Sequence, residues 1–239
     1  MTANRHTFPR SSLALSLALA CGSILLSVST ARGAPTPAHW LGGSGDWSDP
    51  AHWDIGVVPN NTGPSTYGVT IEGPAEDLVV TVSKGITVSR IVSTERIQVA
   101  GGGTLAVLGI LVNAGEIVAA GGTVRLDNTT ADNAGGTIVA DGGVVEVVNS
   151  TINGGVLRAT DKATSLVRFS GDVTLNGVPW VDDGAGEFQI INTKARMLGD
   201  YAHRLPAGYR LVLISTYGHF ATAQWTVAEG EFVNHGVIE

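Results

Sequence analysis

The sequence predicts an all-β protein that folds as a right-handed parallel β-helix, a β-solenoid with coils of about 20 residues. Similar units begin at Asn113, Asn133 and Asn153, so the step is twenty residues both times. Within each unit apolar and polar residues alternate, which indicates strands with one buried face. So short a unit cannot bury that face alone. We therefore expect the units to stack, with neighbouring strands about 4.8 Å apart.

Each coil is expected to contain two short strands joined by bends. Glycine pairs mark the bends at Gly121–Gly122 and Gly142–Gly143, because glycine tolerates positive φ. The alternation places Arg125 and Glu146 on the outside. Six apolar residues are expected to point into the core: Ile117, Val124, Leu126, Ile138, Val145 and Val147.

Stacking these units also brings opposite charges together. The repeat continues upstream, where Arg96 aligns beside Glu116. With one-residue adjustments, Arg125 lies beside Glu146 and Glu146 lies beside Arg168. Each such cross-strand pair contributes roughly 0.2–1 kcal/mol. A structural charge ladder therefore explains these residues without an active site.

The repeated asparagines are expected to occupy equivalent bends on successive coils. Asn113, Asn133 and Asn153 would then stack their side chains at the strand spacing. Asparagine suits such a position because it tolerates left-handed φ and its amide bonds nearby backbone. Asn133, as the middle member, would have a neighbour on each side.

Residues 1–33 have the pattern of a bacterial secretory signal. Two arginines precede an apolar run from Leu13 to Val28, and Ala31-Arg-Gly33 places small residues where a signal peptidase reads them. We expect cleavage before Ala34. A lipoprotein signal at Cys21 is the alternative, although the apolar run continues past this cysteine.

The chain that remains after cleavage is acidic and contains no cysteine. Removing the three arginines of the signal changes the formal net charge from −7 to −10. Such a surface does not favour nucleic acid or an anionic membrane. No second apolar stretch is long enough to span a bilayer, so we expect no transmembrane segment in the mature chain.

Residues 34–64 are rich in tryptophan and glycine, with the run Trp40-Leu-Gly-Gly-Ser-Gly-Asp-Trp47 followed by Trp53. This run resembles the segment that opens bacterial autotransporter-associated β-strand repeat proteins and related PEP-CTERM-type exported proteins. The phrases Gly102-Gly-Thr-Leu105 and Asn113-Ala-Gly-Glu-Ile117 are similar to phrases that follow it in those proteins. The resemblance covers residues 40–160 and implies an exported or surface-associated repeat protein. It brings no catalytic residues.

The sequence departs from that family near its C-terminus. The residues given after the repeats are too few for an outer-membrane barrel and do not show a Pro-Glu-Pro sorting tail, so we expect neither route of anchoring. The expected location is therefore secreted, at the cell surface or in the bacterial periplasm. The anchoring mode stays open.

The residues Trp40, Trp47 and Trp53 have two interpretations. Exposed rings beside aspartates would make a carbohydrate contact. A solenoid, however, needs its end covered, because an open end exposes core and unpaired strand edges. We favour an N-terminal cap over residues 34–64, followed by solenoid repeats in residues 65–172. Residues 173–239 read as an irregular, aromatic-rich β segment, in which Asn234–Ile238 echoes an earlier coil.

The sequence contains no pattern of catalytic or cofactor-binding residues. Its histidines have no metal-ligand spacing, and we expect no metal or cofactor. An EF-hand-like spacing from Asp172 to Asp183 lacks flanking helices and is expected to be a turn. Four charged residues on neighbouring coils leave a polysaccharide-cleaving site open: Asp141, Glu146, Arg158 and Asp161.

The expected function is that of an exported structural or adhesive β-solenoid protein of the cell envelope or extracellular space, without catalysis. Envelope or extracellular polysaccharide and other surface proteins are the expected partners. The alternative is a β-helical protein that binds or cleaves polysaccharide.

Overall fold

The structure is a computed structural model of the 239-residue chain. It describes residues 33–73, 78–179, 186–191, 194–198, 204–205, 209–214, 224–227, 233–234 and 237–239. Residues 34–239 form one unit of the chain and residues 1–33 another. The predicted secretory signal and Cys21 lie outside the described residues, as does Asp183.

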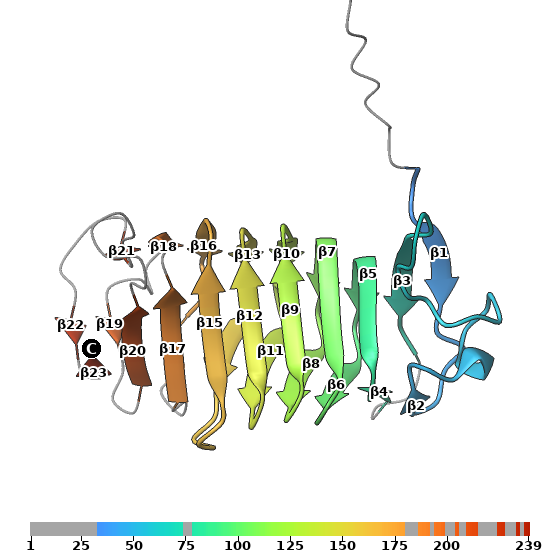
Figure 1. Ribbon diagram of the computed structural model, residues 1–239, viewed down its shortest axis with the longest axis horizontal. Coiled ribbons are helices and arrows are strands. Elements are labelled where there is room, and N and C mark those ends of the chain that lie inside the picture. The colour runs from blue at the N-terminus through green and yellow to red at the C-terminus, as the bar shows by residue number, and fades with distance from the viewer. Residues whose placement is uncertain are drawn as a thin grey trace, which may run out of the picture. The chain divides into compact units, whose positions relative to one another are not determined.

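The described part of residues 34–239 forms a parallel β-solenoid of about 6 turns with a spacing of about 21 residues (Figure 1). Strands of successive coils pair in parallel, and the described part of the chain has no α-helix. Within that part, no helix is long and apolar enough to cross a membrane. The predicted fold class is confirmed.

Three ladders of parallel strands make up the solenoid. The first ladder contains β2 (Gly45–Asp46), β4 (Val79–Val82), β6 (Arg96–Ala100), β8 (Glu116–Ala120), β11 (Thr137–Asp141) and β14 (Val156–Ala159). The second contains β9 (Thr123–Asp127), β12 (Val144–Val148), β15 (Leu166–Ser170), β17 (Gly186–Ile191), β20 (Tyr209–Ile214) and β23 (Val237–Ile238). The third contains β1 (Thr36–His39), β3 (Tyr67–Ile71), β10 (Thr130–Asp132), β13 (Thr151–Asn153), β16 (Val173–Asn176), β18 (Lys194–Leu198) and β21 (Gln224–Val227).

Two long strands belong to both the second and the third ladder. They are β5 (Gly85–Ser93) and β7 (Thr104–Asn113), which pair along two segments separated by a register shift. In β7 the chain turns at Gly109, where φ is 141°. In the next two coils Asn128 and Asn149 adopt left-handed φ at the corner, and the strands separate there. Each of these coils therefore has three strands.

The prediction of two strands in each coil is wrong. The missed strand is the third one, represented by β10 and β13, each three residues long. Three residues contain only one inward position, so they show too little alternation to be distinguished from a bend. Two further short strands, β19 (Arg204–Leu205) and β22 (Val233–Asn234), pair with each other.

The core has the composition that the alternation predicts. All six residues expected to point inward have no exposed surface, while Arg125 and Glu146 lie on the outside with side chains 38% and 22% exposed. The core continues beyond the expected repeats, because Phe169, Phe188 and Tyr209 are buried one per coil. Their ring centroids are 6.0 Å and 5.6 Å apart.

The parallel pairing also continues past residue 172. Strands β16 and β18 extend the third ladder, and β17 and β20 extend the second. The described parts of residues 173–239 therefore follow the same stacking rule as the repeats. These parts lack the sequence phrases of the repeats. They pair in the same way nevertheless, because parallel pairing needs only inward apolar residues at alternate positions.

Candidate functional site

The tryptophan-rich segment packs as a cluster at the N-terminal end of the described coils (Figure 1). Trp40, Trp47 and Trp53 are 5%, 0% and 1% exposed. Their indole N–H groups donate to backbone oxygens, that of Trp47 to Pro59 at 3.0 Å and that of Trp53 to Trp47 at 2.8 Å. The ring of Trp40 stacks on His52 with centroids 4.5 Å apart.

This packing bears on the two interpretations of the tryptophans. The rings contact one another, with Trp53 4.9–5.0 Å from both other tryptophans. A sugar stacks on an exposed ring face, and these side chains are buried. The carbohydrate contact through Trp40, Trp47 and Trp53 stays a prediction that this packing does not favour. Burial with satisfied N–H groups is what a cap requires.

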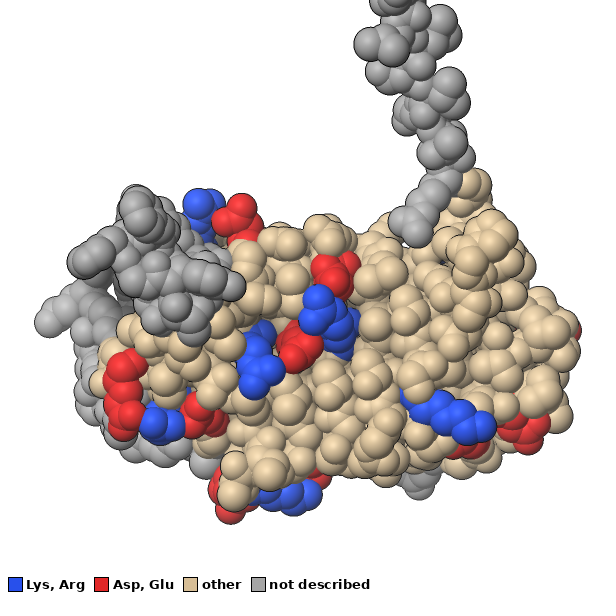
Figure 2. Space-filling model, viewed as in Figure 1, with Lys and Arg blue, Asp and Glu red and all other residues tan. Residues whose placement is uncertain are grey.

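The outer face of the second ladder bears the charge ladder expected from the sequence. Glu146 lies between two guanidinium groups, 2.9 Å from Arg125 and 3.0 Å from Arg168. Arg125 also contacts Asp127 at 2.9 Å, and hydrogen bonds to both carboxylates raise its pKa. Figure 2 shows acidic and basic side chains next to one another near the middle of the face, with further charged groups toward its edges. The predicted register is confirmed.

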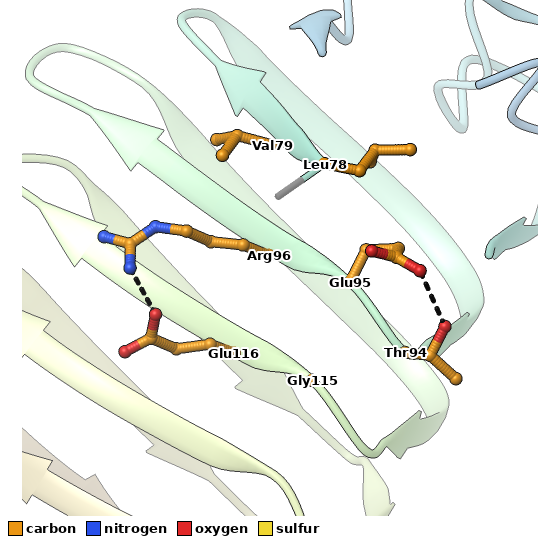
Figure 3. A pocket seen from close by; sticks show the side chains of 7 residues that line it. All are labelled: Leu78, Val79, Thr94, Glu95, Arg96, Gly115 and Glu116. Atoms are coloured by element: carbon orange, nitrogen blue, oxygen red, sulfur yellow. Dashed lines mark hydrogen bonds and ion pairs between the residues drawn. The ribbon is translucent and has the colours of Figure 1, made fainter. Parts of the chain in front are cut away.

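The first ladder contains the predicted pair of Arg96 and Glu116, which form a salt bridge. The pair borders a depression of about 350 Å³ that Leu78, Val79, Thr94, Glu95 and Gly115 complete (Figure 3). Glu95 accepts hydrogen bonds from Thr94 and from the backbone N–H of Gly73 at 3.0 Å each. The charged groups that line this depression are thus bound by other residues of the chain.

The four residues considered for polysaccharide cleavage do not form one group. Asp141 ends β11 in the first ladder, whereas Glu146 lies on β12 in the second. Asp141 accepts hydrogen bonds from Lys162 at 2.7 Å and from Thr160 at 3.0 Å. The hydrogen bond from Lys162 lowers the pKa of Asp141, so this carboxyl is ionised at neutral pH. Asp161 lies in an exposed bend and Arg158 lies on β14.

The buried asparagines form a shorter column than expected. Asn113 and Asn133 are buried, and Asn113 Nδ2 donates to Asn133 Oδ1 at 2.7 Å. Asn153 does not join them, because its register partners are Asp132 and Asn176 in the third ladder. The predicted three-membered column is therefore wrong in its third member.

The cause is a shortened bend. From Asp132 to Thr137 the chain takes five residue steps, but between their register partners Asn153 and Val156 it takes three. The equal twenty-residue step from Asn133 to Asn153 is thus not a structural repeat. Bends absorb such length changes because the strand pairing on either side stays intact.

The third ladder contains a polar array that the sequence reasoning missed. Successive strands repeat the triplet Thr-x-Asp/Asn, with the middle residue buried and its neighbours outside. The array consists of Thr130, Asp132, Thr151, Asn153, Thr174 and Asn176. The triplets are 21 and 23 residues apart, so a search at a fixed step of twenty does not align them.

No metal site emerges from the described residues. Among them, no three His, Cys, Asp or Glu side chains form a group that could hold a metal ion. Of the EF-hand-like spacing, Val173–Asn176 is strand β16, with Val173 and Leu175 in the core. The expected turn is therefore wrong for Val173–Asn176, which forms a ladder strand because Val173 and Leu175 alternate into the core, and this strand does not wrap an ion.

Comparisons with protein-family models, with curated proteins and with solved structures find no match for this chain.

Proposed function

We propose that the chain is an exported β-solenoid protein with a structural or adhesive role at the cell envelope or in the extracellular space, without catalysis. The pairing of its charges is the main support. Asp141 and Glu146, the acidic residues considered for chemistry, are each bound by basic side chains of neighbouring coils. Charges paired in this way stabilise a stack, and leave little capacity to act on a substrate.

Export is supported by two features of the sequence. Residues 1–33 have the pattern of a secretory signal, and residues 40–160 resemble exported autotransporter-associated repeat proteins. Envelope polysaccharide and other surface proteins are the partners that we propose.

Cell fractionation tests the proposed location. The full chain is expressed in a bacterial host with a C-terminal epitope tag, and the cytoplasmic, periplasmic, membrane and medium fractions are immunoblotted. We expect a shortened product outside the cytoplasm. A full-length product that stays in the cytoplasm would refute export.

The alternative is a polysaccharide-cleaving protein, and turnover tests it. General acid catalysis needs a carboxyl that keeps its proton near neutral pH, whereas the pKa of Asp141 is lowered. We expect no reducing ends when the full chain is incubated with neutral and acidic polysaccharides. Release that disappears in Asp141→Asn or Glu146→Gln would establish the alternative.

A further inference from the structure

Each of the three ladders has an edge strand at the N-terminal end of the described coils (Figure 1). The first ladder begins at β2 and the third at β1. The second begins with the first half of β5, where Gly85–Val88 pair with β7 but not with β3. Alternate residues of an edge strand point their backbone N–H and C=O groups away from the stack. A row of free groups of this kind is a template to which another chain can add a strand.

Asn60 closes the edge of the second ladder in the way that a further strand would. Its side-chain amide donates to the Gly85 carbonyl at 3.1 Å and accepts from the Thr87 N–H at 2.9 Å. A residue of a parallel strand opposite Ile86 would make the same two hydrogen bonds with its backbone. The N–H of Asn61 then donates to the Thr87 carbonyl at 2.6 Å. The amide of Asn60 thus takes the place of a peptide group in a missing strand.

Asp54 closes the edge of the third ladder. The N–H of Trp40 donates to Thr70 on β3, so Pro37 and His39, at the alternate positions, face outward. The N–H of His39 donates to Asp54 Oδ1 at 2.7 Å, and the His39 carbonyl accepts from the Asp54 N–H at 3.0 Å. Pro37 has no N–H to donate. Neither outward residue of β1 therefore has a free N–H.

Ser44 closes the first ladder. Strand β2 begins at Gly45, which is too late along the chain to accept from the N–H of Val79 at the start of β4. The hydroxyl of Ser44 accepts from that N–H at 3.0 Å. On β2 itself, the carbonyl of Asp46 faces outward and accepts from the Asp49 N–H at 3.0 Å. Each ladder is thus closed by one side chain of the cap, and we call Ser44, Asp54 and Asn60 the edge-closing residues.

A second copy of the chain is the partner that these contacts exclude. Two identical N-terminal ends present the same edge strands to each other across a two-fold axis, so an open edge would meet its own copy and pair with it. Charge acts in the same direction, because the cap residues 34–64 contain Asp46, Asp49 and Asp54 and no lysine or arginine. Like charges brought together at two such ends repel each other. Both the closed backbone groups and the uniform charge therefore oppose pairing of like ends.

We propose that the edge-closing residues prevent the N-terminal end of the solenoid from pairing with the same end of a second copy of this chain. The buried tryptophans of the cap cover the core, whereas the edge-closing residues bind the outward backbone groups of the first strands. These are two separate tasks of one segment. The inference goes beyond the proposed function and does not depend on it, because strand edges pair through backbone groups wherever the chain is located.

The test opens two edges and leaves the tryptophan cluster in place. A double variant combines Asp54→Ala and Asn60→Ala in the full chain, which frees the N–H groups of His39 and Thr87. Asp54→Ala alone is measured as well, because its hydrogen bond to His39 is exposed and its loss leaves the core unchanged. Circular dichroism melting establishes which variants are folded.

A matched control removes the same two residue types elsewhere. It combines Asp49→Ala and Asn176→Ala. The side chain of Asp49 accepts from the Ala51 N–H within a turn, and that of Asn176 donates to Asn153 on the outer face of the third ladder. The backbone N–H of Asp49, which binds the Asp46 carbonyl, is kept in alanine. The control therefore loses the same charge without opening an edge.

Analytical ultracentrifugation measures the mass of each protein over roughly a hundredfold range of concentration, at about 0.15 M ionic strength to screen the aspartates. We expect the wild type and the control to keep the monomer mass. The double variant should approach about twice that mass as its concentration rises, and Asp54→Ala alone should do so at higher concentration. The proposal is overturned if the folded variants keep the monomer mass throughout, or if the control associates as they do.

A unique cysteine locates the contact between copies. Cys21 is first replaced by serine, since residues 34–239 contain no other cysteine. Thr36→Cys then places a thiol on β1, and Ala163→Cys places one in an exposed bend after β14. Under mild oxidation, the double variant should form disulfide-linked dimers faster through Thr36→Cys than through Ala163→Cys, and the wild type should not. Equal rates at the two positions in the double variant, or a wild type that links through Thr36→Cys as fast as the double variant, would overturn the proposal.

Discussion

Replacing Asn133 by alanine tests the buried asparagine column directly. Asn133 has no exposed surface and lies where the chain bends from the third ladder into the first. Its Oδ1 accepts from Asn113 at 2.7 Å, and its Nδ2 donates to the carbonyls of Gly136 and Val156 at 3.3 Å. Alanine removes all three hydrogen bonds and leaves space in a closed bend.

The expected loss of stability depends on which hydrogen bonds remain after the substitution of Asn133. Asn113 keeps longer contacts from its Nδ2 to the carbonyls of Gly115 and Thr137, both at 3.3 Å. The Gly136 carbonyl still accepts from the N–H of Val156 at 2.9 Å. Asn133→Ala therefore removes one short hydrogen bond and weaker, longer ones, and it leaves a small cavity. We expect the free energy of unfolding to fall by about 1–3 kcal/mol. In a unit of this size each kcal/mol lowers Tm by about 2–4 °C.

The matched control is Asn153→Ala. Asn153 has the same spacing in the sequence, but it is half-buried on the outer face and its side chain accepts only from Asn176, at 3.3 Å. Its replacement should change stability by less than about 0.5 kcal/mol. Urea unfolding and thermal melting of the wild type and both variants are compared. Equal losses, or an Asn133→Ala variant that melts like the wild type, would refute the register described here.

Asn133→Asp gives the same site a pH dependence. The new carboxylate would face the carbonyl oxygens of Gly136 and Val156 that the amide now donates to. Burial and these oxygens raise the pKa of such a carboxyl above its unfolded value, so the variant is penalised at pH 7 and recovers as it protonates. We expect it to melt closer to the wild type at pH 4 than at pH 7, and a constant difference would contradict this.

Three further predictions address the charges and one bend. Glu146→Gln should cost about 1 kcal/mol or less, and less still in high salt, because its ion pairs are partly exposed; an unfolded variant would contradict this. The lowered pKa of Asp141 means that its pair with Lys162 stabilises the fold at pH values above the ordinary pKa of 3.8. In urea unfolding, the wild type should therefore be more stable than Asp141→Asn above pH 3.8, and this difference should disappear as the pH falls below 3.8. Gly143→Ala places a Cβ 2.4 Å from the Gly122 carbonyl and should cost about 1–3 kcal/mol, whereas Gly85→Ala meets nothing and should melt like wild type.

The core and the charge register could be predicted because they depend on local geometry. A strand places alternate residues on opposite faces, so Ile117 and Ile138 are assigned to the core by parity alone. Aligning similar units then brings Arg125 beside Glu146 and Arg168, because parallel strands in register place equivalent residues side by side. Neither step requires the path of the chain between strands.

The third strand and the Thr-x-Asp/Asn triplets of the third ladder could not be predicted in this way. Strands β10 and β13 are too short to show a period, and the triplets that contain Thr130, Thr151 and Thr174 recur at unequal steps. Inserting or deleting a bend residue changes the step without changing the pairing. A fixed step of twenty therefore paired Asn133 with Asn153, where the structure pairs Asn153 with Asp132.

The sequence by itself determined the all-β class, the parallel stacking, the inward residues and the charge ladder, since each follows from a two-residue alternation repeated at short intervals. Only the tertiary structure decided where each bend shortens, which asparagines meet inside, and that three threonines on β10, β13 and β16 form a straight column outside. The reason is physical: hydrogen bonding between coils sets the register strand by strand, while the bends take up whatever length the chain supplies.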